Sequence, residues 1–213
     1  MRHRIAGNRI SMPEPKRRAT FRNLIDGLFT HEHIHTTEAR AKAVQGEAER
    51  LIAIAIRGHN KAWAHLKSVV DDDDLAEQVL ALAQRGRFSL DETISPLDEL
   101  NQQRERDHKL PLSEEGRRHR EERLLGFQRE MLNLIKDRDE AQRALTAARE
   151  AMAIEVHSRR TILKHLPYEL RVKKIFDLFV PRYSSRRGGY TRISKIGFRK
   201  GDGAHIVRLE MVQ

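Results

Sequence analysis

Cysteine is absent from the 213-residue chain, and aromatic residues make up only 5% of it. Without cysteine, disulfide bonds, thiolate-ligated zinc and catalysis by a thiol are excluded. The longest apolar run, "LIAIAI" (51–56), is much shorter than the roughly 18 residues that a membrane helix needs. The N-terminal "MRHRIAGNRISMPEPKRR" lacks the apolar stretch of a secretory signal. The sequence therefore predicts a soluble, cytoplasmic protein with no membrane segment.

Charged residues are abundant and unevenly distributed. Residues 1–58 carry a net charge of +5 and residues 157–213 one of +10, whereas residues 59–156 carry −5. Dense positive charge favours a polyanionic partner, because each phosphate that is neutralised releases a condensed counterion. A solvated basic surface without a partner would have the same composition, so net charge alone leaves both interpretations open.

The N-terminal part of the chain predicts an arm and two helices. Residues 1–19 lack hydrophobic periodicity and contain Gly7, Pro13 and Pro15, which predicts a basic arm that orders only against a partner. Apolar residues at helical spacing predict a helix over 20–30 and a second helix from Thr37, a suitable N-cap. The intervening "HEHIHTT" alternates and ends in β-branched residues, which predicts an extended segment.

His31 to His35 match H-E-x-x-H, the metal-site pattern of the zinc metalloproteases. That site needs both histidines one turn apart on a helix, whereas here a helix is predicted to begin just after the motif. In a strand, residues four apart are separated by roughly 13 Å, which is too far to share one zinc ion. We therefore interpret the match as fortuitous and predict neither a metal site nor a cofactor.

The acidic block, residues 59–156, is dominated by helical patterns. Asp74 and Glu77 form a capping-box start for a helix that ends at Gly86, and Ser95 starts another helix. From about residue 113 to 158, apolar residues recur in three- and four-residue steps with one skip at Arg138, which predicts one long helix. "DDDD" (71–74) lacks the glycine and spaced glutamate of a calcium loop and is interpreted as a solvated helix cap. The block is predicted to be a protruding helical or coiled-coil segment, either solvated or docking another protein.

The C-terminal part predicts a helix, a basic loop and a hairpin. "YELRVKKIFDLFV" places Leu170, Ile175, Phe176 and Phe179 on one helical face, and Pro181 is expected to end that helix. "RYSSRRGGY" is a basic loop, and "YTRISKIGF" and "HIVRLEMV" are two strands joined by the turn "RKGDG". The predicted fold is α/β (α+β), a small sheet with packed helices and a C-terminal β-hairpin.

Two groups of residues, one at each end of the chain, have the chemistry of RNA binding. Arginine forks suit phosphates, arginine or tyrosine planes can stack on bases, and glycines let backbone amides approach phosphate oxygens. Because aromatics are scarce, backbone electrostatics should dominate, which favours structured RNA over single strands. Neither group contains a carboxylate–histidine pair or a Ser/His/Asp set, so no enzyme is predicted. The candidates are Arg2, His3, Arg4, Arg9, Lys16, Arg17, Arg18 and Arg22, and Arg182, Arg186, Arg187, Gly188, Gly189, Tyr190, Arg192, Lys195, Arg199 and Lys200.

Three motifs carry a resemblance to a known family. They are "MRHR..G", then "FRNL..GL..HE.I.TT..RAK", and near the other end "PRY.SR.GGYTRI.K.GFR.GD". In these motifs, which lie in residues 1–58 and 159–213, the chain resembles the bacterial large-subunit ribosomal protein seventeen family. In that family "HE" is followed by apolar residues, a basic residue and "TT", in the strand before the second helix. His35 stands at the basic position, which accounts for the zinc-protease-like spelling.

The resemblance implies helices packed against a small sheet and a structural role in translation, binding large-subunit ribosomal RNA. It also implies a place on the solvent side near the nascent-chain exit, beside ribosomal proteins such as twenty-two and thirty-two. Both groups of candidate residues would then be ribosomal RNA contacts.

The chain departs from the family pattern between its two halves. The family passes from its second helix to the segment matching "SRRTILKHL" within a few residues, whereas here residues 59–156 intervene. We therefore expect a ribosomal RNA-binding body, 1–58 and 157–213, and an acidic helical insertion that projects into solvent or contacts protein. The alternatives are a free nucleic-acid-binding protein and a coiled-coil docking module.

Overall fold

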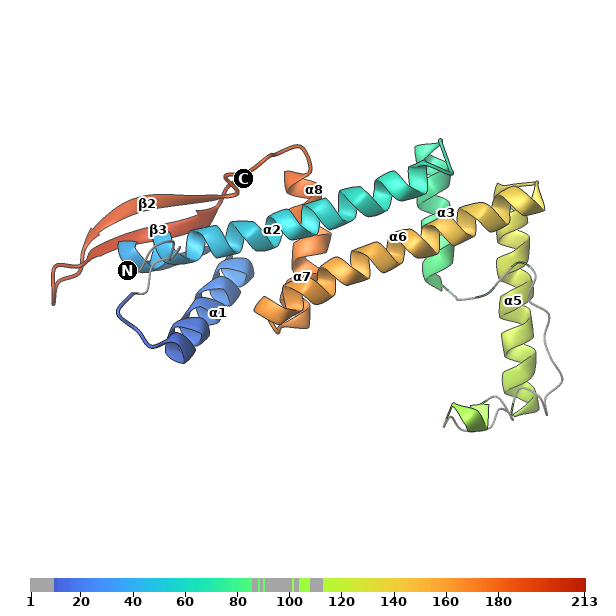
Figure 1. Ribbon diagram of the computed structural model, residues 1–213, viewed down its shortest axis with the longest axis horizontal. Coiled ribbons are helices and arrows are strands. Elements are labelled where there is room, and N and C mark those ends of the chain that lie inside the picture. The colour runs from blue at the N-terminus through green and yellow to red at the C-terminus, as the bar shows by residue number, and fades with distance from the viewer. Residues whose placement is uncertain (1–9, 86–87, 89, 91–100, 102–103, 108–112) are drawn as a thin grey trace, which may run out of the picture. The chain divides into compact units, whose positions relative to one another are not determined.

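The structure is a computed structural model that describes residues 10–85, 88, 90, 101, 104–107 and 113–213. The chain divides into two units, each with buried apolar residues of its own. Unit 1 comprises Met1–Lys61 and Ala153–Gln213, and unit 2 comprises Ala62–Met152. The predicted fold class, α+β with a small sheet and a C-terminal hairpin, is confirmed (Figure 1).

Helix α1 (Glu14–His31) begins earlier than the sequence pattern predicted. Pro13 is its N-cap and Pro15 lies in its first turn, where a missing N–H removes no intrahelical hydrogen bond. Glu14 accepts a hydrogen bond from Arg18 at 2.8 Å. The prediction of an unstructured arm is therefore wrong for residues 14–19, while residues 1–9 lie outside the described part of the chain.

The "HEHIHTT" segment is extended from His33 to Thr37, as predicted, but its first residue, His31, belongs to helix α1. Helix α1 ends at His31, and Glu32 adopts a left-handed conformation, φ 62°, that turns the chain into strand β1 (His33–Thr37). The two outer histidines of the H-E-x-x-H match thus lie on a helix end and on a strand, not one turn apart on a helix.

Helix α2 (Glu38–Lys67) begins directly after Thr37, which confirms the predicted second helix. Its predicted apolar positions are all fully buried; they are Ala41, Val44, Ala48, Leu51 and Ala55. Because these residues recur at three- and four-residue steps, they form one stripe along the helix.

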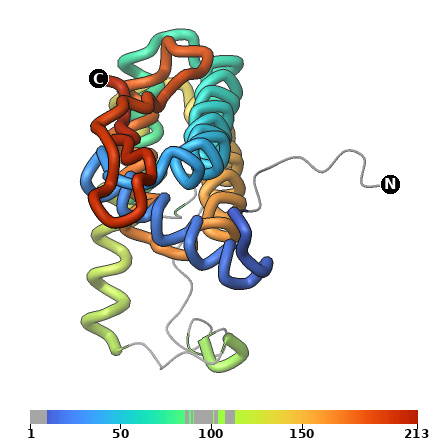
Figure 2. Tube along the Cα trace, turned by 90° about the vertical axis from the view of Figure 1, so that its left-hand side faces the viewer, coloured from blue at the N-terminus to red at the C-terminus, as the bar shows by residue number. Residues whose placement is uncertain are grey.

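The sheet has the order β1-β3-β2 and is antiparallel throughout. Strands β2 (Thr191–Phe198) and β3 (His205–Met211) form the predicted hairpin, and β3 also pairs with β1. Alternation along β3 buries Val207 and Leu209 and turns Arg208 to the other, exposed face. In Figure 2 the red trace follows the two strands of this hairpin.

The helical segment that begins at Glu169 carries two corrections. Helix α7 (Glu169–Lys174) continues through a π-helical turn, η1 (Ile175–Phe179), into α8 (Val180–Tyr183). Pro181 was predicted to end the helix, but the helical conformation continues past it to Tyr183, directly after a π-helical turn that changes the hydrogen-bond pattern ahead of the proline. Leu170 was predicted on the buried face but is 74% exposed, whereas Ile175, Phe176 and Phe179 are buried as predicted.

The prediction of a single long helix from 113 to 158 is wrong, because the structure has two helices there. Helix α5 (Glu114–Leu134) starts after the N-cap Ser113, and Ile135 is extended. Helix α6 (Arg138–His165) then begins, with the Asp137 carboxylate accepting from the Asp139 N–H at 2.9 Å. The break falls where the apolar pattern skips a position, because a cap there satisfies the new helix start.

Helix α3 (Asp73–Arg85) confirms the helix predicted before Gly86. Its cap differs from the prediction, since Asp72 rather than Asp74 accepts a hydrogen bond, from the Asp74 N–H at 3.0 Å. The predicted helix start at Ser95 lies outside the described residues. None of the helices in the described ranges is both long and apolar enough to cross a membrane.

Candidate nucleic-acid interface

The first group of candidate residues lies partly on helix α1. Lys16 and Arg18 are exposed there, and Arg17 and Arg22 are half-buried. Arg18 is paired with Glu14 at 2.8 Å, whereas Lys16 has no ion-pair partner among the described residues. The other members of the group lie outside the described residues; they are Arg2, His3, Arg4 and Arg9.

The second group centres on the loop between α8 and β2. Arg186 and Arg187 are exposed, and no carboxylate among the described residues lies within ion-pair distance of either. Gly189 has φ 65°, a conformation that favours glycine. A Cβ at Gly188 or Gly189 would meet nothing within 4 Å, so the backbone here is open to an approaching ligand.

Further along the chain, the hairpin carries four more candidate cations. Arg192 and Lys195 are exposed on β2, and Arg199 and Lys200 lie at the turn that follows. The Arg199 guanidinium donates to both oxygens of Asp202, from Nε at 2.8 Å and from Nη2.

Two candidates are engaged inside the protein. Tyr190 is 5% exposed, its ring lies 5.2 Å from that of Tyr183, and its hydroxyl donates to the Arg186 carbonyl at 3.3 Å. Its ring is therefore not presented for stacking on a base. The Arg182 guanidinium donates to Glu32 at 2.7 Å and lies over the Phe179 ring.

Glu32 joins the end of α1 to the segment that leads into the basic loop. Its carboxylate pairs with Arg182 at 2.7 Å and with Lys174 at 3.3 Å. The hydrogen bond from Arg182 is the largest cause that lowers the pKa of Glu32 from its ordinary value of 4.5, and burial opposes it. Arg182 precedes Arg186 by four residues, so the Glu32–Arg182 ion pair helps to position the loop between α8 and β2.

We expect the Glu32 pair to make stability fall in acid. A carboxyl whose pKa is lowered on folding contributes stability above its unfolded pKa and loses it as the pH falls through the folded pKa. Glu32→Gln should reduce the free energy of unfolding by about 1–2 kcal/mol at pH 7 and by less below pH 4. Urea unfolding at several pH values measures this; a deficit that is equal at all pH values would contradict it.

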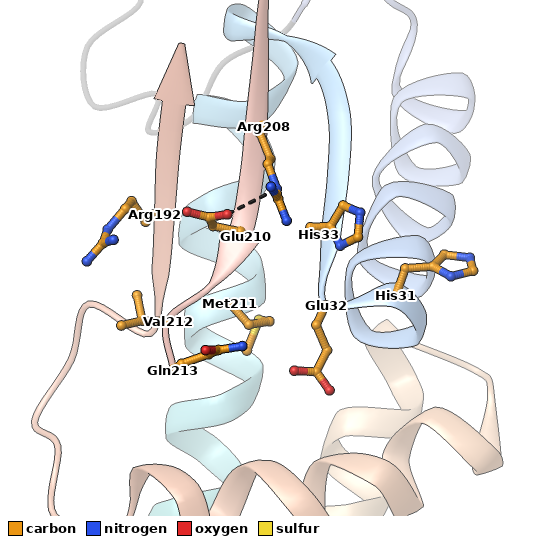
Figure 3. A pocket seen from close by; sticks show the side chains of 9 residues that line it. All are labelled: His31, Glu32, His33, Arg192, Arg208, Glu210, Met211, Val212 and Gln213. Atoms are coloured by element: carbon orange, nitrogen blue, oxygen red, sulfur yellow. Dashed lines mark ion pairs between the residues drawn. The ribbon is translucent and has the colours of Figure 1, made fainter. Parts of the chain in front are cut away.

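A cleft of 510 Å³ opens on the exposed face of the sheet (Figure 3). Its lining includes His31, His33, Arg192 and Arg208, and Arg208 pairs with Glu210 at 3.0 Å. His33 and Arg192 flank Glu210 in the strand register, from β1 and β2 respectively. The described residues contain no group of three or more His, Asp or Glu that could hold a metal ion.

Sequence reasoning missed the contribution of His33, His35 and Arg208 to this face. Strand alternation predicts that the two histidines share a face. They lie near Arg208, which comes more than 170 positions later in the chain, because β1 pairs with β3. No local pattern reveals this pairing.

Charge is divided between the units. Unit 1 contains 26 Lys and Arg against 11 Asp and Glu, a net charge of +15, whereas unit 2 contains 15 against 20, a net charge of −5. A polyanion would therefore be attracted to unit 1.

Comparison with known proteins identifies the family. The family described as Ribosomal protein L17 matches residues 20–212. The large ribosomal subunit protein bL17 of Clostridium beijerinckii is 45% identical over 209 residues, which cover 98% of this chain and 100% of that relative.

Two further relatives match over a shorter segment. The bL17 of Clostridium acetobutylicum is 49% identical over 72 residues, 34% of this chain and 60% of that protein, and the bL17 of Clostridium botulinum strain Hall is 42% identical over 72 residues, 34% and 61%. The aligned segments are a larger share of these relatives than of this chain, so both relatives are shorter. The chain belongs to the ribosomal protein L17 family.

Proposed function

We propose that this chain is a structural constituent of the large ribosomal subunit that binds ribosomal RNA through unit 1 and has no catalytic role. The observation that carries the proposal is the family match over residues 20–212. The net charge of +15 on unit 1 supports RNA as its ligand.

The RNA-binding surface has three parts, all in unit 1: the first half of α1, the loop at 184–190 and the β2–β3 hairpin. Arg186 and Arg187 provide guanidinium groups for phosphate oxygens, and the amides of Gly188 and Gly189 can approach the same backbone. The loop is bounded by the buried Tyr183 and Tyr190, which restricts the cations to one region before RNA binds.

The resemblance extends the proposal to a location. It implies a place near the nascent-chain exit, beside ribosomal proteins twenty-two and thirty-two. Crosslinking of intact large subunits followed by mass spectrometry tests this location. Crosslinks to ribosomal proteins that include neither of these two would contradict it.

We further propose that residues 59–156 are an insertion that does not bind RNA. Two observations support this, the net charge of −5 on unit 2 and the shorter length of two relatives. Acidic side chains repel phosphates, so such a segment is suited to solvent or to a protein partner. Leu125 and Leu132, seven residues apart on α5, are exposed and favour the docking of a protein.

Sedimentation of the tagged chain from cell lysate tests both parts of the proposal. The full chain should migrate with the large subunit and resist a high-salt wash. A chain in which a short Gly-Ser turn replaces residues 62–152 should do the same, since the RNA-binding surface lies in unit 1. A full chain at the top of the gradient would indicate a free nucleic-acid-binding protein. Loss of the shortened chain alone would contradict the insertion part.

A further inference from the structure

The turn end of the β2–β3 hairpin presents large apolar side chains to solvent. Phe198 is 70% exposed and Ile196 is 55% exposed. A single exposed apolar side chain is ordinary, but an exposed aromatic ring with an exposed aliphatic neighbour often marks a contact surface.

The length of the hairpin explains this exposure. Phe198 pairs with His205, and alternation along β3 puts His205 on the same face as the buried Val207 and Leu209. In Figure 1 the hairpin extends past the first turn of α2. The turn end of the hairpin, where strand β2 ends at Phe198, therefore lies beyond the helix. A β-bulge between Lys195 and Gly197 leaves Ile196 without a register partner.

Hydrogen bonds hold the turn in one conformation. The Arg199 N–H donates to the Ala204 carbonyl and the Gly203 N–H donates to the Arg199 carbonyl, both at 2.9 Å. The Asp202 carboxylate accepts from the Arg199 side chain at 2.8 Å and from the Ala204 N–H at 3.2 Å. Gly203 has φ 67°, which favours glycine.

The Phe198 ring is supported on one side. The His205 ring lies 4.6 Å from it at an interplanar angle of 48°. A side chain held in this way loses little conformational entropy when a ligand contacts it, so the exposed ring is preorganised for binding.

The charges around the ring favour a nucleic acid over an apolar protein surface. Lys195 and Lys200 are exposed on either side of Phe198 in the sequence, and Arg199 follows it directly. The nearby acid, Asp202, is paired with Arg199, whose hydrogen bond lowers its pKa to about 2. An exposed ring with cations close to it along the chain suits a base with its phosphates, because the ring stacks while the cations meet the backbone.

We propose that Phe198, supported by His205, stacks on an unpaired base of an RNA, with Lys200 meeting a phosphate beside it. This inference rests on the proposed function, since it requires that unit 1 binds ribosomal RNA. The RNA contacts predicted from the sequence in this hairpin are all cations, and the proposal adds an aromatic stacking contact to them.

Binding of the full-length chain to large-subunit ribosomal RNA, measured by filter retention, tests the proposal. Phe198→Ala and Phe198→Leu should each weaken binding by roughly 5- to 150-fold, and Phe198→Trp should retain it. The slope of affinity against salt should not change, because stacking releases no counterions. Leu170→Ala, at another exposed apolar residue of unit 1, is the matched control and should bind as the original chain does.

The outcomes separate this proposal from the proposed function. If the original chain binds the RNA and all Phe198 variants bind equally, only the stacking proposal is wrong. Retained binding by Phe198→Leu with loss in Phe198→Ala would also overturn it, because the contact would be apolar but not aromatic. If the original chain does not bind, the proposed function fails and the stacking proposal with it.

Crosslinking identifies what covers the ring in the assembled particle. A benzophenone-bearing phenylalanine analogue at position 198, in large subunits that contain the full chain, should crosslink to RNA on irradiation. A crosslink to a protein instead would overturn the proposal and identify this hairpin as a protein contact.

Discussion

Gly58→Leu should lower the free energy of unfolding by about 1–3 kcal/mol, the usual effect of overpacking a closely packed site. Gly58 lies on α2 and is buried, and a Cβ placed on it would overlap the Ser158 Oγ and lie 2.5 Å from the Ser158 Cβ. Both residues belong to unit 1, so α2 and α6 approach closely at this point. Because a Cβ cannot rotate away, the helices have to separate. Chemical unfolding of the full chain, followed by circular dichroism, measures the effect.

Gly46 is the matched control, because it lies on the same helix and a Cβ placed on it would meet nothing within 4 Å. Gly46→Leu should leave stability unchanged or raise it by up to about 1 kcal/mol, through helix propensity alone. Ser158→Gly in the Gly58→Leu background should restore part of the stability, giving a favourable coupling in a double-mutant cycle. Equal effects of the two leucine substitutions would refute the close contact.

The largest effect on RNA binding should come from removing cations of unit 1 that have no ion-pair partner among the described residues. Each phosphate that is no longer neutralised lowers the slope of log affinity against log salt by about 0.7–0.9. Removing four such cations should weaken binding at 0.1 M salt on the order of a thousandfold. The substitutions to glutamine are at Lys16, Arg186, Arg187 and Lys200.

The control removes the same amount of charge from unit 2. It replaces exposed cations of α5, α6 and the turn between them, namely Arg118, Arg129, Lys136 and Arg143. We expect affinity for large-subunit ribosomal RNA, measured by filter retention across salt concentrations, to stay within a few-fold of the original. If this control variant bound as weakly as the unit 1 variant, binding would depend on total charge and not on the proposed surface.

Patterns that act over a few residues predicted their elements well. Alternation in "HEHIHTT" and in the two C-terminal strands corresponds to β1, β2 and β3, and the apolar stripe from Ala41 to Ala55 is the buried face of α2. The break between α5 and α6 also has a local signal, the skipped apolar position at Arg138, which follows the capping Asp137 of the structure. Periodicity that continues on both sides of one skip favours a single helix, so this signal is weak in the sequence.

Whether a candidate side chain is available for a ligand is not a local property. Tyr190 and Arg182 have the residue types of RNA contacts, but one packs against Tyr183 and the other pairs with Glu32, 150 positions away. Phe198 has no distinguishing pattern, since a phenylalanine in a strand is ordinarily buried. Its exposure follows from how far the hairpin extends past α2 (Figure 1).

The sequence by itself determined the family, the charge segregation, the starts of α2 and α5, and the strands of the hairpin. These depend on residue identity, on side-chain alternation and on caps, which act within a few residues. The tertiary structure decided which cations are paired, which aromatic rings are buried, and where α2 and α6 meet at Gly58 and Ser158. These depend on packing between segments that are far apart in the chain, because burial is set by whichever surfaces fold against each other.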